Sequence, residues 1–190
     1  MISPLSNIHQ HLNCFIKRCN VFNTLLAHGK GYAYLEATGE YFLKPISFAT
    51  QRFTSSSFNQ WTKIEKSYGA YWRAFDGANA IREEEEEYQY MIGGFDFVLD
   101  LLATLDTMEP IVDLMLHLQS LDGPIWKLKS WWANMKYKME SLSVAEVFPR
   151  VERAEKDGKL APGSMYQGVE FFTKQVYPLS IFSHINHLSP

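Results

Sequence analysis

Aspartates at helical spacing in the middle of the chain are its clearest candidates for metal chemistry. Asp96 and Asp100 are four positions apart and would share one face of a helix, and Asp106 and Asp113 follow them. Paired carboxylates bind divalent metals in many enzymes that hydrolyse phosphodiesters. An amphipathic helix that turns these acids toward solvent explains the same spacing. We favour this second interpretation, because no basic or histidine side chain lies at a matching spacing.

Metal-ligand residue types also gather near the N-terminus: His9, His11, Cys14, Cys19 and His28. Imidazole and thiolate groups are the ligands that zinc uses in proteins. However, Cys14 and Cys19 differ by five positions, which separates them by about 140° around a helix, and the chain has no CxxC pair. We therefore predict no metal site, and we expect surface histidines and core-facing thiols instead.

A tryptophan-rich segment places aromatic rings beside lysines. It contains Trp126, Trp131 and Trp132 together with Lys127, Lys129, Lys136 and Lys138. Such rings can stack on bases while the lysines contact phosphates. Tryptophans buried in a helical core explain the same residues, and we favour that interpretation. The glutamates at 83–87 are expected to form a solvated helix face.

Composition limits the remaining function classes. The 190 residues suit about one domain, and a hydrophobic content of 46% can fill a core. The net charge of −3 gives no overall basic signature for a nucleic-acid partner. Two cysteines make no disulfide framework, which indicates a reducing compartment. The sequence contains no P-loop, nucleophile elbow, Rossmann glycine pattern or catalytic triad.

We expect a soluble, intracellular chain that does not enter membranes. The first seven residues lack the basic region and the continuous apolar stretch of a secretory signal. The most apolar candidate for a span, residues 91–105, contains two aspartates. It is also shorter than the roughly 20 apolar residues that a transmembrane helix needs.

Helices must position these side chains, since apolar residues recur every three or four positions along most of the chain. Thr54 or Ser55 is expected to cap a helix with a broad aromatic face that ends before Asp76-Gly77. Pro110 is expected to start a new helix, because proline suits the first helical turn. The last helix should turn Trp131 inward. The predicted helices cover residues 7–27, 32–40, 54–75, 79–91, 95–108, 110–121 and 125–142.

The predicted fold class is mainly α, a helical bundle with a short extended segment near 46–53 and a disordered C-terminal tail. Pro45 disfavours helix before it, and β-favouring residues follow. After Ser143 the helical period weakens, and glycines and prolines indicate loops. We therefore divide the chain into N-terminal helices with a connector (1–44), a helical domain (45–142), and an amphipathic segment with a poorly ordered tail (143–190).

Part of the chain resembles the hAT superfamily of DNA transposases. Thr50-Gln51-Arg52-Phe53 and residues 54–61 are similar to the Arg-aromatic element that precedes a long helix in that family. Residues 28–36 resemble the approach to this element. Residues 95–105, 109–110 and 114–119 resemble the helical insertion that interrupts the family's RNase H-like core. The resemblance covers roughly residues 27–140 and rests on the order of these segments.

The resemblance also implies that the catalytic parts of such a transposase are missing. Family members cut DNA with three acids that hold two divalent metals. Two of these acids lie upstream of the Arg-aromatic element, where this chain has only Glu36 and Glu40. The third acid lies beyond the helical insertion. The four aspartates discussed above fall inside the insertion, so none of them corresponds to a catalytic acid. The resemblance therefore implies no enzyme activity, no catalytic residue, no metal and no cofactor.

What the resemblance does imply is a contact with DNA at Arg52 and Phe53. These residues occupy the positions of the family's Arg-Trp pair, whose ring stacks on a distorted or flipped base. Phenylalanine keeps the stacking face but lacks the indole N–H. The expected protein is a truncated or domesticated transposase remnant, nuclear or cytoplasmic, that binds DNA or a transposase-like protein and has no small-molecule substrate. A stand-alone helical module that docks a protein partner, and a nuclease with unusually arranged acids, are the alternatives.

Overall fold

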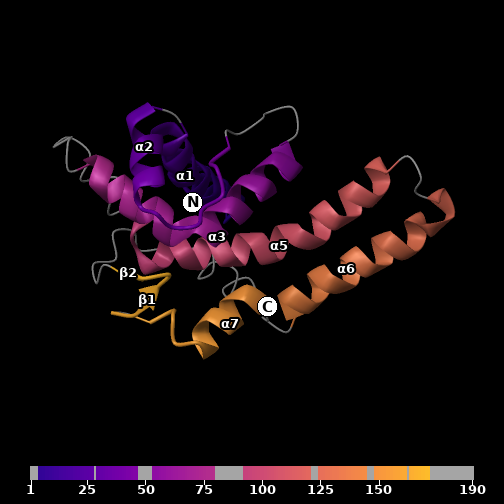
Figure 1. The fold of residues 1–190 in the computed structure, drawn as a ribbon. Coiled ribbons are helices and arrows are strands. Elements are labelled where there is room, and N and C mark those ends of the chain that lie inside the picture. Colours follow the sequence, from indigo (N-terminus) through magenta and orange to yellow (C-terminus); the bar gives the residue numbers. More distant parts are fainter. Residues whose placement is uncertain are drawn as a thin grey trace.

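The computed structural model describes residues 4–27, 29–46, 53–79, 92–120, 124–144, 148–161 and 163–171; at 4–11, 53, 77–79 and 143–144 it describes the backbone alone. This part of the chain is mainly helical, as predicted, and none of its helices is long and apolar enough to cross a membrane. Its elements are α1 (Pro4–Leu26), α2 (Gly29–Ala37), α3 (Phe53–Asn79), α5 (Phe95–Gln119), the 3-10 turn η2 (Ile125–Lys127), α6 (Leu128–Val144), α7 (Pro149–Lys156), β1 (Met165–Tyr166) and β2 (Val169–Glu170) (Figure 1).

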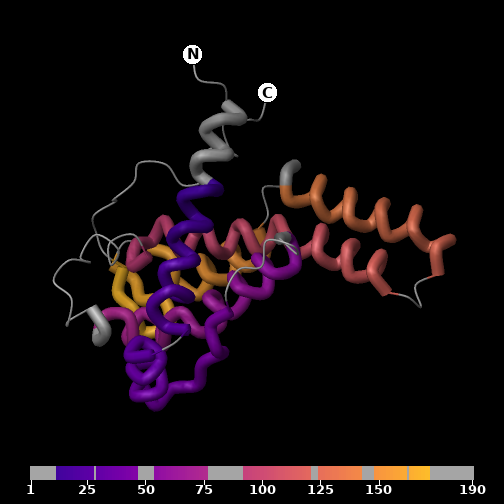
Figure 2. The backbone as a smooth tube through the Cα atoms, turned by 90° about the horizontal axis from the view of Figure 1, so that it is seen from above, coloured from indigo at the N-terminus to yellow at the C-terminus, as the bar shows by residue number. Residues whose placement is uncertain are grey.

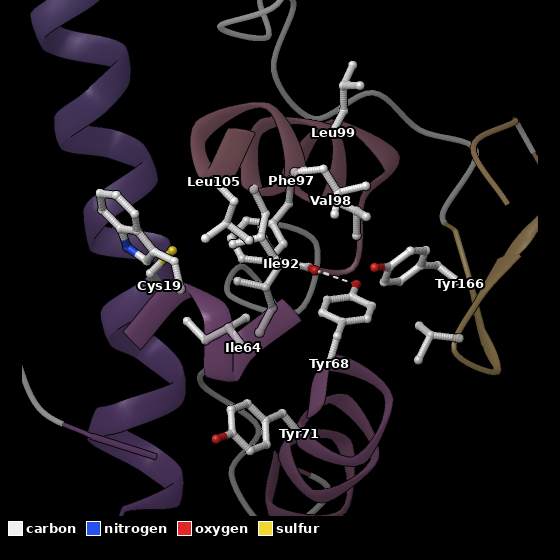
Figure 3. Close-up of a cluster of buried hydrophobic side chains, with 14 of the residues drawn as sticks. Cys19, Ile64, Tyr68, Tyr71, Ile92, Phe97, Val98, Leu99, Leu105 and Tyr166 are labelled. Atoms are coloured by element: carbon white, nitrogen blue, oxygen red, sulfur yellow. Dashed lines mark hydrogen bonds between the residues drawn. The ribbon is translucent and has the colours of Figure 1, made fainter. Parts of the chain in front are cut away.

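The first half of α5 is the centre of the fold. Every residue from Phe97 to Asp106 is buried, as expected of a helix that other elements surround. Aromatic rings from α1 and α3 pack against it: the centroid of the Phe97 ring lies 6.1 Å from that of Phe22 and 6.2 Å from that of Tyr68. The Tyr68 hydroxyl donates a hydrogen bond of 2.7 Å to the Ile92 carbonyl oxygen, just before α5 (Figure 3). Packing of large rings around one apolar helix therefore holds the body together.

α5 continues without a break through Pro110, so the prediction of a new helix at this residue is wrong. A proline inside a helix removes one backbone hydrogen bond and costs about 3 kcal/mol. Here the helix is fixed on both sides of the proline. Asp106, one turn before, binds α7, and Asp113, one turn after, faces α6. Pro110 itself is buried, and tertiary packing outweighs its local preference.

α3 is longer than predicted at both ends. It begins at Phe53, so Thr54 and Ser55 lie in its first turn and do not cap it, and it runs past Asp76-Gly77 to Asn79. The extended segment predicted near 46–53 does not include Phe53, and residues 47–52 lie outside the described part of the chain. The predicted helix at 79–91, with the glutamates at 83–87, also lies almost entirely outside it.

A bend in α3 is the docking point for the C-terminal hairpin. Ser67 has φ −122° and ψ 17°, which is not helical. In a regular helix the Gly69 N–H would donate to the Glu65 carbonyl. Instead Gly69 N–H donates to Gln167 Oε1 (3.1 Å), and Gln167 Nε2 donates to the Glu65 carbonyl oxygen (2.6 Å). The side-chain amide of Gln167 is thus inserted into one hydrogen bond of the helix, and this replaces the interaction that the bend removes.

The hairpin itself was not expected from the sequence, which indicated loops after α7. β1 and β2 are antiparallel, with Tyr166 opposite Val169. The turn between them has positive φ at Gln167 (50°) and Gly168 (77°), as a two-residue type I′ turn requires. Phe171 after the hairpin packs on Phe95, with ring centroids 6.0 Å apart. α7 coincides with the predicted amphipathic segment, and residues 172–190, with the predicted tail, lie outside the described residues.

The second half of α5 and α6 form an antiparallel helical hairpin that projects from the body (Figures 1 and 2). We call this part, residues 107–119 together with η2 and α6, the arm. The predicted helix at 125–142 corresponds to η2 and α6. Along α6 Trp131, Met135 and Met139 are half-buried against α5, whereas most of its other residues are exposed. The arm therefore presents a large side-chain surface that the body of the protein does not cover.

Candidate functional site

Asp96 and Asp100 do not form a metal-binding pair. Asp96 makes an ion pair of 3.2 Å with Arg18 of α1, and the two side chains are only 14% and 6% exposed. Asp100 is buried, close enough to Cys19 that its charge contributes to the raised pKa of that thiol. In the described part of the chain no group of three or more histidine, cysteine, aspartate or glutamate side chains could hold a metal ion. The two acids therefore belong to the packed interface between α1 and α5.

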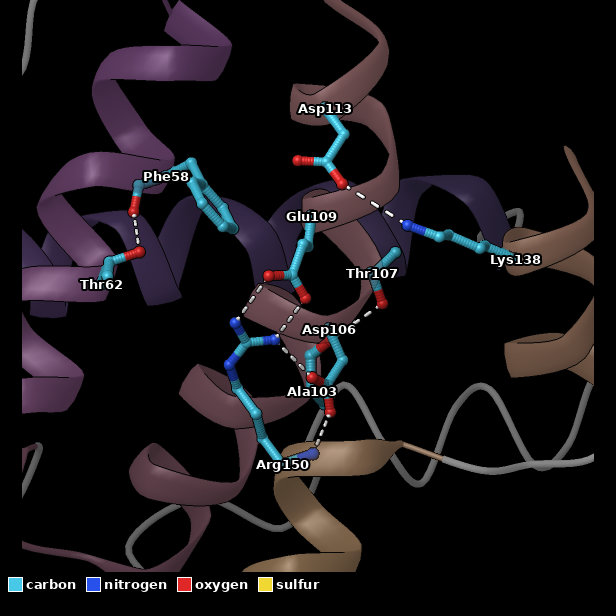
Figure 4. Close-up of polar contacts among 9 residues, drawn as sticks. All are labelled: Phe58, Thr62, Ala103, Asp106, Thr107, Glu109, Asp113, Lys138 and Arg150. Atoms are coloured by element: carbon cyan, nitrogen blue, oxygen red, sulfur yellow. Dashed lines mark hydrogen bonds and ion pairs between the residues drawn. The ribbon is translucent and has the colours of Figure 1, made fainter. Parts of the chain in front are cut away.

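Asp106 joins α5 to α7 through Arg150 (Figure 4). The Arg150 guanidinium donates to Asp106 Oδ1 at 2.6 Å and to both carboxylate oxygens of Glu109 at 3.0 and 3.2 Å, and the Arg150 backbone N–H donates to Asp106 Oδ2 at 2.8 Å. Burial raises the pKa of Asp106, although Arg150 opposes this shift. Burial alone would lower the pKa of Arg150, but its bonds to Glu109 and Asp106 raise it well above its ordinary value. This cluster fixes the start of α7.

The prediction that the aspartates form a solvent-facing stripe is therefore wrong for Asp100 and Asp106, which are both buried. The physical reason is that neighbouring elements surround the first half of α5 and supply basic groups to its acids. Asp113, further along the helix, does lie at the surface, 3.5 Å from Lys138 of α6 (Figure 4).

The N-terminal cysteines are packing residues, as predicted. Cys19 is fully buried, and burial raises the pKa of its thiol well above the ordinary value. Cys14 is half-buried and free. The side chains of His9 and His11, and the whole of His28, lie outside the described residues. A thiol with a raised pKa is a poor nucleophile and a poor metal ligand.

The predicted DNA contact falls at the edge of the described chain. Arg52 lies outside it, and of Phe53 only the backbone is described, as the first residue of α3. The two residues therefore remain a prediction.

The tryptophan-rich segment exposes two of its three tryptophan side chains. Trp126 is 81% exposed and Trp132 is 56% exposed, so the interpretation of these two residues as core is wrong. Only Trp131 is half-buried, with its ring centroid 5.0 Å from that of His117. The core interpretation failed because α6 packs mainly against one helix, which covers one flank and leaves the others open.

Three of these exposed side chains form a continuous stripe along α6. Lys129, Trp132 and Lys136 are three and four positions apart, which places them on one flank of the helix, and all three are exposed. We call them the Lys–Trp stripe. Lys136 Nζ lies 3.5 Å from a carboxylate oxygen of Glu140, but both side chains are more than half exposed and such a pair is weak. Trp132 is thus flanked along the helix by two exposed lysines.

Positive charge is concentrated in η2 and α6, the second helix of the arm. Residues 125–144 contain four lysines and one glutamate, a net charge of +3, whereas the whole chain has 18 basic and 21 acidic residues and a net charge of −3. The remaining residues carry a net charge of −6, which includes the five glutamates at 83–87, outside the described part of the chain. A basic, aromatic helix surface favours a polyanionic partner.

Comparison with known proteins adds no further information: no family model matches the chain, and neither curated proteins nor solved structures give a significant match.

Proposed function

We propose that this chain is a non-catalytic binding module and that the Lys–Trp stripe of the arm contacts single-stranded nucleic acid. The observation that carries the proposal is the exposed indole of Trp132 between the exposed ammonium groups of Lys129 and Lys136 on one helix flank. An aromatic platform beside basic groups is what proteins use to bind single strands without sequence preference. The rings stack on bases, while the lysines contact the adjacent phosphates.

Energetics support a role in binding for the exposed tryptophan. The exposed part of an aromatic ring adds no burial energy to folding, whereas one base stacked on it contributes about 1–3 kcal/mol to binding. Each lysine that neutralises a phosphate adds a favourable term that weakens with salt. The stripe is also placed on a projecting hairpin, where a strand can approach α6 without meeting the body of the protein.

The proposed origin of this module is a hAT-type transposase that has lost its catalytic acids. This part of the proposal rests on the resemblance of residues 27–140 to that family, and it gives the protein a nuclear location and a transposon-derived history. Arg52 and Phe53 would then form a second contact with DNA, separate from the arm. Binding of a DNA hairpin by Arg52→Ala and Phe53→Ala variants tests this contact, and affinities equal to that of the unchanged chain would rule it out.

The test of the stripe is a binding titration of a fluorescently labelled single-stranded oligonucleotide followed by anisotropy. Trp132→Ala should weaken binding about tenfold, because one stacked base is lost. The matched control is Tyr137→Ala, which removes another exposed aromatic ring (71% exposed) from the same helix, five positions further on and away from the stripe. It should leave affinity within about twofold. Equal losses in the two variants, or no binding by the unchanged chain at low salt, would contradict the proposal.

A protein-binding role is the second candidate, and a specific observation favours it. Aliphatic side chains near the tip of the arm are exposed, among them Leu116 (54%), Leu118 (52%) and Ile125 (79%). Such side chains suit a protein partner better than a nucleic acid, because they offer neither stacking faces nor charge. Affinity capture that recovers one partner protein in stoichiometric amount, lost when Ile125 is changed to Asp, would support this role.

A further inference from the structure

A cavity lies in the body of the protein, between α3, α5, α7 and the C-terminal hairpin. Its volume is about 270 Å³, and Glu65, Leu102, Arg153, Ala154 and Tyr166 contribute to its walls. This volume is near the lower end of the range for small-molecule pockets, so it suits a ligand of amino-acid size. Leu102 and Ala154 are apolar and buried, which gives the cavity an apolar wall among charged groups.

Most polar groups around the cavity are already committed to other partners. Arg150 binds Asp106 and Glu109 (Figure 4), and Lys159 pairs with Asp157 at 2.7 Å. The Gln167 amide bridges the backbone of α3. Arg150 and Gln167 therefore shape the cavity but have little remaining capacity to bind a ligand, whereas the Lys159–Asp157 pair is about half exposed and weak.

Two charged side chains of opposite sign differ from the rest. Within the described part of the chain, neither the Glu65 carboxylate nor the Arg153 guanidinium makes a hydrogen bond or an ion pair with another side chain, and no ion pair joins the two. Both nevertheless face the same cavity, and each contributes to the electrostatic surroundings of the other. The cavity thus offers one uncommitted anion and one uncommitted cation, held apart.

Glu65 is the more buried of these two side chains. Its side chain is half-buried, and burial raises its pKa, an effect that Arg150 opposes only in part. Burial removes part of the water around the Glu65 carboxylate. The ammonium group of a ligand would replace that water with a charge-assisted hydrogen bond, which favours binding. Arg153 is exposed, and its planar fork of N–H donors matches the two oxygens of a carboxylate.

We infer that this cavity binds a small zwitterion of the amino-acid class. The ligand's carboxylate would lie on Arg153, its ammonium group on Glu65, and an apolar side chain against Leu102 and Ala154. The sequence alone indicated no small-molecule ligand. This site is separate from the arm, and it does not depend on nucleic-acid binding.

Three ligands that share one isobutyl side chain test the charge requirement directly. L-leucine carries both charges, 4-methylpentanoate only the carboxylate, and 3-methylbutylamine only the ammonium group. In calorimetric titrations of the full chain we expect leucine to bind about tenfold more tightly than either analogue. Equal affinity for leucine and either analogue, or no leucine binding up to about 10 mM, would overturn the inference.

Two variants assign the charges to their residues. Glu65→Gln should lower the affinity for leucine to that for 4-methylpentanoate and leave binding of the acid unchanged. Arg153→Gln should lower the affinity for leucine to that for the amine. Lys156→Gln is the matched control, because Lys156 is on the same helix as Arg153 but pairs with Glu152. A thermal unfolding curve verifies that each variant is folded, and a folded Glu65→Gln or Arg153→Gln protein that binds leucine like the unchanged chain contradicts the assignment.

Discussion

Two tryptophans illustrate how differently one residue type is used in this protein. Trp61 of α3 is 1% exposed, and its ring centroid lies 5.4 Å from that of Phe15 in α1. Trp132 of α6 is 56% exposed and has lysines on either side along its helix. Both have apolar neighbours at helical spacing in the sequence, so the hydrophobic pattern predicts that both side chains are buried. Their roles differ because α3 lies inside the body, whereas α6 contacts mainly one helix.

Tyr68 is the residue through which alkaline pH should act on the fold. Burial, and after it the charge of Asp96, raises the pKa of Tyr68 well above the ordinary value of 10.0. Burial also raises the pKa of Tyr166, to about 12. As pH rises past about 10, these groups ionise in the unfolded chain but not in the folded one. The folded state then holds the extra protons, so each group's contribution to stability is complete below pH 10 and is lost above it.

Tyr68→Phe should therefore have two effects on the free energy of unfolding. At neutral pH it should lower this free energy by about 1–3 kcal/mol, because the Ile92 carbonyl loses its hydrogen-bond donor. Above pH 10 the decline of stability with pH should become shallower by about 1.4 kcal/mol per pH unit, the contribution of one titrating group. Urea unfolding between pH 7 and about 11 measures both effects.

Tyr41→Phe is the control for this experiment, since Tyr41 is 82% exposed and its replacement should change stability by less than about 0.5 kcal/mol. If the Tyr68→Phe protein declines above pH 10 as steeply as the unchanged protein, Tyr68 is not the group responsible.

At the scale of elements, the bend in α3 is where separate parts of the chain meet. The connector after α2 reaches the bend, where the Leu43 backbone N–H donates to Ser67 Oγ at 2.9 Å. The C-terminal hairpin reaches it through Gln167. A Cβ atom at Gly69 would lie 2.3 Å from the Gln167 carbonyl oxygen, so only glycine allows the hairpin to approach this closely.

Gly69→Ala should consequently destabilise the protein by about 1–3 kcal/mol, even though alanine is the better helix former. The cause is displacement of the hairpin from α3, so amide exchange should accelerate in residues 165–171. Lys66→Ala, at an exposed position in the same turn, should change stability by less than about 0.5 kcal/mol. A Gly69→Ala protein that is as stable as the control variant would show that the close approach to the hairpin is not required.

The helices were predictable from the sequence because their apolar periodicity is strong, and α1, α3 and α6 all coincide with predicted segments to within a few residues. Features that depend on tertiary contacts were not. Pro110 continues a helix because both of its flanks are anchored, and Asp106 is buried because Arg150, 44 positions away in the chain, reaches it. The hairpin did have a local signal, Gln167-Gly168 between apolar residues, but a turn of this kind is recognised most readily when asparagine or aspartate precedes the glycine.

The candidate site was visible in part. The sequence showed that lysines and tryptophans occur together, and Lys129, Trp132 and Lys136 already had the spacing of one helix flank. The predicted inward flank with Trp131 is the one that packs on α5, but the sequence did not show that α6 packs mainly against this one helix, and this decides whether Trp132 is core or surface. The cavity could not be predicted, because Glu65 and Arg153 are 88 positions apart and meet only through the packing of α3 and α7.

At the scale of the whole molecule, charge and shape are divided between two parts. The body contains the aromatic core, the buried ion pairs and the cavity, and the arm extends from it (Figure 2). Most side chains of α6 are exposed. Residues 125–144 carry a net charge of +3 in a chain whose overall charge is −3. A polyanion should therefore bind at α6, and its binding should depend on salt.

The most direct test of this account is the salt dependence of binding to a single-stranded oligonucleotide. With Lys129 and Lys136 on phosphates, the logarithm of the binding constant should fall against the logarithm of salt concentration with a slope of about −1.4. Replacing Lys129 and Lys136 together with glutamine should reduce the magnitude of this slope by about 1.4, whereas replacing Lys156 and Lys159 of the body should leave it unchanged. A slope near zero for the unchanged chain, or equal slopes in both double variants, would contradict nucleic-acid binding by the arm.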